Sequence, residues 1–450
     1  MFETTQSPVS GFDFWAAVSI FVIAYAMIAY EKIHKTVAAI FAASLMLVLR
    51  VLTQHEAFHL ESLGVDWNVI FVLISMMIII NIMKPTGVFE YVAIKSARLG
   101  KCDPVRIMII LTVMTAVLSA FLDNVTTVLL IAPVTIIIAD ALGVDAVPFL
   151  IMEAIASNIG GTATLIGDPP NIMIASKAHL NFMDFIIHLT PVIVIIMAAL
   201  VLIIRIVFGR RLHTTEERKQ MIFQMDGANV ITDPVLLKKS VFVLALVLVG
   251  FVFHRVLYYE PATVTLFGAG LLLLLSNVKN PRRVLAEIEW PTIFFFIGLF
   301  VIVGGVVKVG LIRMASVKVL AITHGSLFAA SMVTLWFSAI ASAIVDNIPY
   351  VAAMNPLIVN MAEHLWPGQS GIELMRHNEL MPIWWSLALG ACLGGNGTAI
   401  GASANVIIVG MAGRAGRKIT FFRFFLYGFP IMILTVLIST AYIWIRYYVL

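Results

Sequence analysis

The stretch Phe121-Leu122-Asp123-Asn124-Val125-Thr126-Thr127 has a second copy 223 positions later, Ile344-Val345-Asp346-Asn347-Ile348-Pro349. Each copy lies midway through a long apolar region, where an acidic residue is unusual. Ordered matches at one fixed offset indicate that the chain is an internal duplication. Further matches at this offset pair Asp66-Trp67 with Glu289-Trp290, Gly87 with Gly310, and Pro133 with Pro356.

A glycine-rich motif is duplicated as well. Gly160-Gly161, Thr164, Gly167 and Asn171 recur 234 positions later as Gly394-Gly395, Thr398, Gly401 and Asn405. The glycines and Pro169-Pro170 are expected to break a helix. A broken helix exposes carbonyl oxygens that suit a cation and a helix N-terminus that suits an anion. Helix packing through small residues explains the glycines, but not Asp168 and the nearby asparagines.

The composition predicts a membrane protein with many crossings. Of its 450 residues, 61% are hydrophobic and 12% are charged, whereas a soluble domain averages about 25% charged residues. Mean hydropathy is +1.01, and one span needs about 20 apolar residues. Cys102 and Cys392 offer neither a disulfide framework nor a zinc site. No nucleotide-binding motif is evident, so transport by this chain would use ion gradients, with no cofactor.

The positions of Lys and Arg give a predicted orientation, because cytoplasmic loops carry an excess of them. If each half has about five crossings and one re-entrant hairpin, 20 of the 29 Lys and Arg fall inside. Both termini are then outside. An odd number of crossings makes the two halves run in opposite directions, which is the inverted repeat of many secondary transporters. The inside regions would be 31–35, 84–106, 209–239, 277–288 and 411–423.

The predicted fold is therefore an all-α polytopic membrane protein in three parts. Residues 1–208 form a first inverted repeat, with a hairpin at 104–142 and a broken helix at 147–177. Residues 209–238 form a charged cytoplasmic linker. Residues 239–450 form the second repeat, with a hairpin at 325–362 and a broken helix at 383–410.

Three carboxylates, those of Asp123, Asp168 and Asp346, are the candidates for proton coupling. A bare carboxylate at the bilayer centre costs about 3 kcal/mol or more, so it is expected to face protein or a water-filled cavity. A proton and a cation such as Na⁺ would compete for the same group, which is the simplest basis for antiport. Asp168 has only Ala402 opposite it in the second half, so this chemistry is expected to be asymmetric.

At these motifs the chain resembles the ion transporter superfamily. Residues 121–133 are similar to the hairpin-tip motif of its arsenite-efflux permease and P-protein branch, and residues 157–171 are similar to its broken-helix motif. NhaD-type sodium/proton antiporters and divalent anion/sodium symporters are related groups. The resemblance implies a scaffold domain that forms a homodimer and a transport domain that slides as an elevator.

The resemblance also implies that the substrate lies between the hairpin tips and the broken helices. In the carboxylate symporters the tips carry Ser-Asn-Thr, whereas here Asp123 and Asp346 replace serine, and Val125 and Ile348 replace threonine. Two acids would repel a dicarboxylate. The expected substrate and ion site comprises Asp123, Asn124, Thr126, Asn158, Gly161, Thr164, Asp168, Asn171, Asp346, Asn347, Gly395, Asn396, Thr398, Ser403 and Asn405.

These observations favour proton-coupled efflux of arsenite or antimonite across the cytoplasmic membrane. The alternatives are a sodium/proton antiporter, with Na⁺ at the same residues, an organic anion transporter, and a passive channel. An enzyme has little support, because no set of nucleophile and base is visible in the apolar segments. The expected partners are the lipid bilayer, a small inorganic substrate and a proton or Na⁺, with no nucleic acid. A soluble ATPase subunit remains open.

Overall fold

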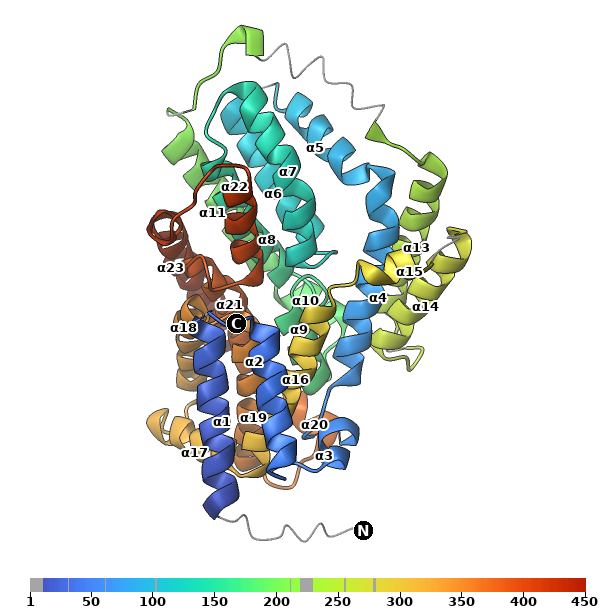
Figure 1. Cartoon of the computed structure of the whole chain (residues 1–450). Helices are drawn as coiled ribbons and strands as arrows, with labels where there is room; N and C mark the ends of the chain where they lie inside the picture. The colour runs from blue at the N-terminus through green and yellow to red at the C-terminus, as the bar shows by residue number, and fades with distance from the viewer. Residues whose placement is uncertain are drawn as a thin grey trace.

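A computed structural model describes residues 11–30, 32–60, 62–101, 103–210, 212–218, 230–254, 256–277 and 281–450. Cys102 and the linker residues 219–229 lie outside this described part. Helices account for all the regular structure found there, and Figure 1 shows them as one bundle without a sheet. The membrane helices predicted from composition are therefore present.

The first half contains helices from α1 to α11. They are α1 (Gly11–Tyr30), α2 (Lys35–Val48), α3 (Gln54–His59), α4 (Trp67–Met83), η1 (Lys84–Thr86), α5 (Val88–Leu99), α6 (Pro104–Ser119), α7 (Asn124–Leu142), α8 (Val147–Thr162), α9 (Pro169–Ala178), α10 (Phe182–His188) and α11 (Thr190–Phe208).

The second half contains helices from α13 onward. They are α13 (Pro234–Phe253), α14 (Pro261–Leu275), α15 (Pro281–Ala286), α16 (Trp290–Lys308), α17 (Leu311–Ile322), α18 (Leu327–Ile344), α19 (Asn347–Leu365), α20 (Gly371–Met375), α21 (Met381–Gly394), η3 (Gly395–Gly397), α22 (Ser403–Arg414), α23 (Phe421–Trp444) and η4 (Ile445–Val449).

The duplicated residues mark equivalent turns in the two halves. Asp123 and Asp346 are the N-caps of α7 and α19, and each side chain accepts a backbone N–H of its helix. Gly87 and Gly310 have φ of 77° and 85°, and each separates a long helix from a short one. Only glycine adopts this left-handed conformation at little cost. The same local chemistry therefore shapes both halves.

Two helix pairs carry the hairpin-tip motifs. In Figure 1, α6 and α7 lie in the upper half of the molecule, and α18 and α19 lie in the lower half. Their turns contain the acidic N-caps, so the two tips approach the middle of the molecule. Pro133 lies inside α7 and Pro356 lies inside α19. Whether these pairs are re-entrant in a membrane stays a prediction.

The glycine motifs interrupt two other helices at the centre of the bundle. Residues 163–168 separate α8 from α9, and residues 395–402 separate α21 from α22 with one short 3₁₀ turn. Gly160 lies so close to α6 that a Cβ would be 2.0 Å from the carbonyl oxygen of Ala116. Gly394 is close to α18 in the same way, with 2.5 Å from such a Cβ to the carbonyl oxygen of Ala339. The broken helices therefore pack directly against the hairpins.

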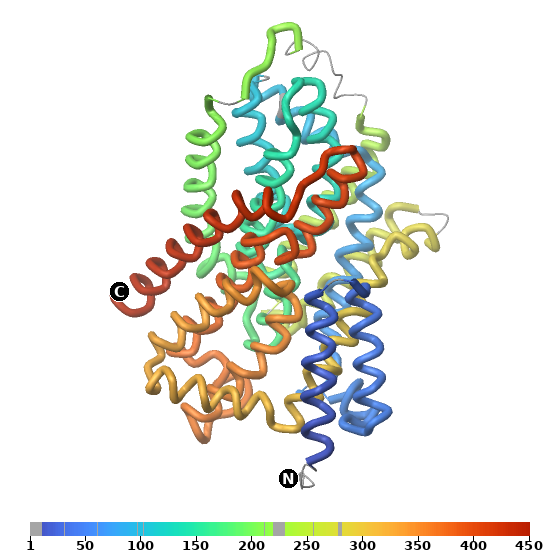
Figure 2. Tube along the Cα trace, turned by 60° about the vertical axis from the view of Figure 1, so that its left-hand side comes forward, coloured from blue at the N-terminus to red at the C-terminus, as the bar shows by residue number. Residues whose placement is uncertain are grey.

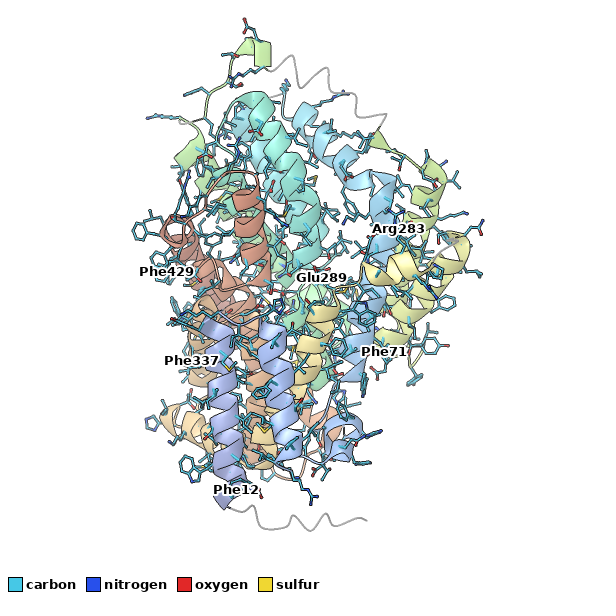
Figure 3. The ribbon with its side chains drawn as sticks, in the orientation of Figure 1. Phe12, Phe71, Arg283, Glu289, Phe337 and Phe429 are labelled. Atoms are coloured by element: carbon cyan, nitrogen blue, oxygen red, sulfur yellow. The ribbon has the colours of Figure 1, made fainter. Side chains whose placement is uncertain are left out.

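Apolar side chains cover the outside of the bundle. Figure 3 shows Phe12, Phe71, Phe337 and Phe429 toward its edges, and these residues are between 38% and 66% exposed. Eight helices of the described chain are long and apolar enough to cross a membrane. The start of α1 and the 212–218 segment lie at opposite ends of the molecule in Figures 1 and 2.

Candidate functional site

The two hairpin tips and the two broken helices meet at a cavity of about 470 Å³. The turns before α7 and α19 contribute Asp123, Asn124, Asp346 and Asn347 to its lining, and the starts of α9 and α22 contribute Asp168 and Ser403. The cavity is also lined by the start of α2 and by the residues around the start of α16. Six of the expected site residues therefore surround one space.

Asp168 connects the two tips. Its Oδ1 accepts a hydrogen bond from the Asn124 side-chain amide at 3.1 Å, and its Oδ2 accepts one from Asn347 at 3.1 Å. Asp168 itself is fully buried. One carboxylate thus holds the same asparagine of both duplicated motifs, although the two asparagines are far apart in the sequence.

Asn158 links the broken helices behind the cavity. Its Oδ1 accepts from Asn124 at 3.2 Å, and its Nδ2 donates to Asn396 at 2.9 Å and to Asn405 at 3.1 Å. The Nδ2 of Asn396 is buried and has no hydrogen-bond partner within the described chain. An unpaired buried amide is costly, so this NH₂ group can donate a hydrogen bond to a ligand or a water molecule.

The remaining expected residues hold the interrupted segments together. Asn171 donates to the carbonyl oxygen of Thr164 at 2.8 Å, and Asn405 donates to that of Thr398 at 2.8 Å. The Thr164 hydroxyl donates to the carbonyl oxygen of Ala120, and the Thr398 hydroxyl donates to that of Ala343. These bonds attach each loop to a hairpin. These four side chains lie behind the cavity wall in this conformation.

Gly161 and Gly395 act as points of close backbone contact. A Cβ at Gly161 would lie 2.6 Å from the carbonyl oxygen of Gly167, and one at Gly395 would lie 2.9 Å from that of Gly401. Any side chain would therefore displace the neighbouring loop. Both glycines shape the site in this structure, and neither borders the cavity.

The two tip carboxylates have different partners. Thr126 donates to Asp123 from both its backbone N–H, at 2.8 Å, and its hydroxyl group. The Oδ2 of Asp346 receives hydrogen bonds of 2.7 Å from the Lys35 ammonium and of 2.7 Å from the Ser403 hydroxyl. The charge of Asp346 is therefore balanced by a lysine, whereas Asp123 binds only neutral donors in the described structure.

Three titratable residues of the cavity lining were not expected from the sequence. His34 is the N-cap of α2, Lys35 is the first residue of α2, and Glu289 is the residue before α16. The duplication could have suggested Glu289, because it corresponds to Asp66. Position 261, which begins α14 as Lys35 begins α2, is a proline, so the repeat gave no signal for the lysine.

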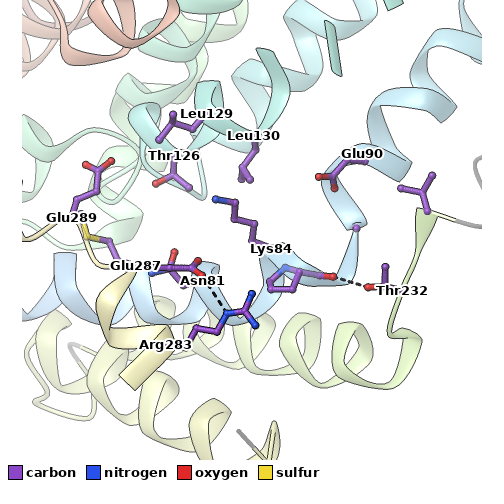
Figure 4. A pocket seen from close by; sticks show the side chains of 14 residues that line it. Asn81, Lys84, Glu90, Thr126, Leu129, Leu130, Thr232, Arg283, Glu287 and Glu289 are labelled. Carbon is purple, nitrogen blue, oxygen red and sulfur yellow. Dashed lines mark hydrogen bonds and ion pairs between the residues drawn. The ribbon is translucent and has the colours of Figure 1, made fainter. Parts of the chain in front are cut away.

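A second, larger cavity of about 690 Å³ lies beside the first. Met77 and Glu289 line both cavities. In Figure 4, Lys84, Glu90 and Arg283 extend into this space, and an ion pair joins Arg283 to Glu287. We call it the vestibule.

The vestibule has a counterpart on the other half of the molecule. A pocket of only about 30 Å³ is lined by Gly64, Asp66, Phe300, Gly304, Val307 and Ala352. At the offset of 223 these residues correspond to vestibule residues Glu287, Glu289, Met77, Asn81, Lys84 and Leu129. Equivalent positions thus surround a wide space in one half and a nearly closed one in the other.

Comparison with known proteins identifies relatives along most of the chain. A family described as citrate transporters (CitMHS) matches residues 25–390. An uncharacterised transporter of Mycobacterium tuberculosis is 44% identical over 434 residues, which cover 96% of this chain and 99% of that protein. The human P protein is 30% identical over 510 residues, which cover 96% of this chain and 60% of P protein.

The fold also resembles a solved structure. The crystal structure of the YdaH transporter of Alcanivorax borkumensis matches with a TM-score of 0.57 at 12% identity, covering 96% of this chain and 97% of that one. At this identity the likeness concerns the fold alone. With the family match and the close relatives, it shows that the chain belongs to the CitMHS citrate transporter family of the ion transporter superfamily and is a multi-pass membrane transporter.

Proposed function

We propose that this protein is a proton-coupled secondary transporter of a substrate that is neutral or cationic as a whole when it binds. The observation that carries this proposal is the charge of the cavity between the tips. Four carboxylates line it, those of Asp123, Asp168, Glu289 and Asp346, and Lys35 is the lysine among its described lining residues. Such a cavity attracts cations and protons and repels a free polyanion.

Arsenous acid and its antimony analogue are the first substrates to test. Arsenous acid is largely uncharged near neutral pH, and its hydroxyl groups can exchange hydrogen bonds with amides and hydroxyls. Asn124, Asn347 and Ser403 present such groups at the cavity. Export in exchange for protons entering the cell would then use the acids as proton carriers. The resulting process would be arsenite efflux across the cytoplasmic membrane.

Citrate is the second candidate, because the matching family is described as citrate transporters. Free citrate near neutral pH carries about three negative charges and would face the same four carboxylates. It would therefore have to bind together with protons or with a metal cation that bridges citrate and protein oxygens. Sodium/proton antiport would use the same acids and is the third candidate. The experiment below distinguishes it from transport of arsenite and of citrate.

The two related pockets support alternating access by an inverted repeat. In the proposed cycle the hairpins and broken helices slide as one transport domain, while α1, α2, α4, α13, α14 and α16 belong to a scaffold that dimerises. Lys84, Thr232 and Arg283 line the vestibule and fall in regions expected to face the cytoplasm. The described conformation is then open to the inside.

Purified protein in proteoliposomes tests the proposal. An inward-directed or outward-directed pH gradient is imposed, and uptake of labelled arsenite, of citrate with and without Mg²⁺, and of Na⁺ is measured. We expect pH-driven, saturable flux of one of these solutes, abolished in Asp123→Asn. Flux of free citrate alone, insensitive to pH and cations, would contradict the proposal. Flux that does not saturate and shows no counterflow would indicate a channel.

A further inference from the structure

Lys35, Asp346 and Ser403 form a closed triangle of polar contacts at the cavity. The Lys35 ammonium lies 2.7 Å from Asp346 Oδ2 and 2.7 Å from Ser403 Oγ, and Ser403 donates to the same Asp346 oxygen at 2.7 Å. The ammonium also lies 5.0 Å from the centre of the Phe295 ring, within reach of a cation–π contact. The side chains of Lys35 and Asp346 are 29% and 10% exposed.

The triangle joins two groups of helices. Lys35 begins α2, which packs on α1 and α16. Asp346 lies at the tip between α18 and α19, and Ser403 begins α22. A second contact links the same groups, since the Tyr25 hydroxyl on α1 donates to the carbonyl oxygen of Pro349 at 2.7 Å. Any movement of this tip away from α1 and α2 must break both contacts.

The first half has no equivalent triangle. Asp123 corresponds to Asp346, but Pro261 begins α14 where Lys35 begins α2, and Pro169 stands at the position equivalent to Ser403. Pro261 carries no charge and does not line the cavity. Lys35 is therefore a feature of one tip only and is not explained by the packing that both halves share.

We propose that Lys35 is a tethered counter-ion of Asp346, which holds the second hairpin on α2 until a transported cation or proton replaces it. This inference rests on the proposed cation- or proton-coupled function. A carboxylate with so little exposure is costly without a partner charge, so the pair is stable while the site is empty. A proton or cation bound at Asp346 neutralises its charge, so the carboxyl group no longer attracts the Lys35 ammonium. The hairpin is then free to move with its load.

Other titratable groups lie close enough to contribute to any pH effect. His34 adjoins Lys35 on the same turn, and three acids line the cavity from other helices, namely Asp123, Asp168 and Glu289. The test therefore changes Lys35 alone and compares it with a lysine on the same turn. Lys32 is exposed and does not line the cavity, so Lys32→Gln is the matched control.

The first measurement needs no substrate. Hydrogen–deuterium exchange of residues 344–350 is followed in detergent between pH 5 and pH 8, after correction for intrinsic exchange. In the natural protein and in Lys32→Gln, the tip should be protected across this range, because the ion pair of Lys35 and Asp346 holds it on α2. In Lys35→Gln protection should be low throughout, and Lys35→Arg should restore it. Equal protection in Lys35→Gln and the natural protein would overturn the inference.

The second measurement is the pH profile of flux in proteoliposomes, for whichever of arsenite, citrate–Mg²⁺ or Na⁺ the natural protein transports. Without a competing ammonium, a proton binds at a lower proton concentration. Half-maximal activity should therefore move by about one pH unit or more toward alkaline pH in Lys35→Gln. An unchanged profile refutes the role of Lys35 and leaves the transport function intact. Absence of proton-coupled flux in the natural protein refutes the function, and the exchange experiment still decides on Lys35.

Discussion

The carboxylate of Asp168 receives hydrogen bonds from both hairpin tips, through Asn124 and Asn347. Each of its oxygens accepts one amide hydrogen. Asp168→Asn would present an NH₂ group to one of these donors, so one tip would lose its bond and a buried donor would be unpaired. The expected loss of unfolding free energy is about 1–3 kcal/mol.

Thermal unfolding in detergent measures this loss, together with flux in proteoliposomes. Asp233→Asn is the matched control, because Asp233 is an exposed N-cap of α13 and asparagine caps a helix as well as aspartate does. The bridging role of Asp168 would be refuted if the two variants had the same melting temperature.

The duplication located much of the candidate site, because acids and amides at mid-segment positions are costly without a purpose. Asp123, Asp168 and Asp346 do line one cavity, which agrees with the expectation that they lie together. Their role in binding stays a prediction. Lys35 could not be found in this way, since Pro261 stands at its position in the other half and its contact depends on how α2 meets the start of α19.

At the scale of elements, the contact between α6 and α8 depends on the absence of a side chain at Gly160. A Cβ there would lie 2.0 Å from the carbonyl oxygen of Ala116, and a backbone atom cannot rotate away. Gly160→Ala should therefore destabilise the protein by about 1–3 kcal/mol or prevent its folding, as overpacking of a core does.

Gly410 on α22 is the control for this change, because a Cβ there would meet nothing within 4 Å. Gly410→Ala should be neutral or stabilise its helix by about 0.5–1 kcal/mol. Expression and melting temperature in detergent compare the two variants. If Gly160→Ala melted at or above the temperature of Gly410→Ala, the close contact of α6 and α8 would be wrong.

A further contact joins α3 to the end of α16. Lys308 lies 2.7 Å from Glu56 Oε2, and Glu56 also completes a capping box with Thr53. Burial alone would raise the pKa of Glu56, but hydrogen bonds from Lys308 and Thr53 together with the lysine charge outweigh it and lower the pKa. The pair therefore stabilises the fold fully above the ordinary glutamate range, near pH 4.3, and loses its effect as the pH falls through the lowered pKa.

Glu56→Gln tests this pair, because glutamine can keep the capping box. The variant should be less stable than the natural protein by about 1 kcal/mol or less between pH 6 and pH 8. The difference should shrink toward zero below the ordinary glutamate range. Detergent unfolding at several pH values measures it, and a difference that grows in acid would have the wrong sign.

The element boundaries show what the sequence could and could not give. Glycines and Pro169-Pro170 predicted an interrupted helix, and the structure has the interruption at residues 163–168. The same glycine pattern led to Gly161 and Gly395 as site residues, whereas a Cβ at either would meet backbone. The spacing of small residues cannot tell whether they approach a ligand or a neighbouring chain segment, because both need the same absence of bulk.

At the scale of the whole molecule, the vestibule of about 690 Å³ and its counterpart of about 30 Å³ differ although their linings correspond. Leu129 lines the former, and Ala352 occupies the equivalent place in the latter. In a Cys102→Ser, Cys392→Ala background, a cysteine at position 129 should react with a maleimide at least about tenfold faster than one at 352.

Conditions that drive the opposite conformation should narrow this difference, because alternating access exchanges the two environments. Labelling with and without a pH gradient, in right-side-out and inverted vesicles, measures the rates and the accessible side. Equal rates at both positions under every condition would contradict the proposed cycle. The sequence could not predict the two cavity volumes, because the similar sequences of the two halves do not indicate which conformation the protein adopts.

Pro133 and Pro356 weaken the hydrogen bonding of α7 and α19, the helices that line the vestibule and its smaller counterpart. Proline has no backbone N–H, so the carbonyl oxygens of Leu129 and Ala352, four residues earlier, receive no helical hydrogen bond. α7 and α19, which follow the two tips, thus each lack one backbone hydrogen bond at this point. Bending of the helix at this point breaks no further backbone hydrogen bond. The carbonyl oxygen of Leu129 can be hydrated from the vestibule. Each hairpin can therefore bend at this point while the transport domain moves.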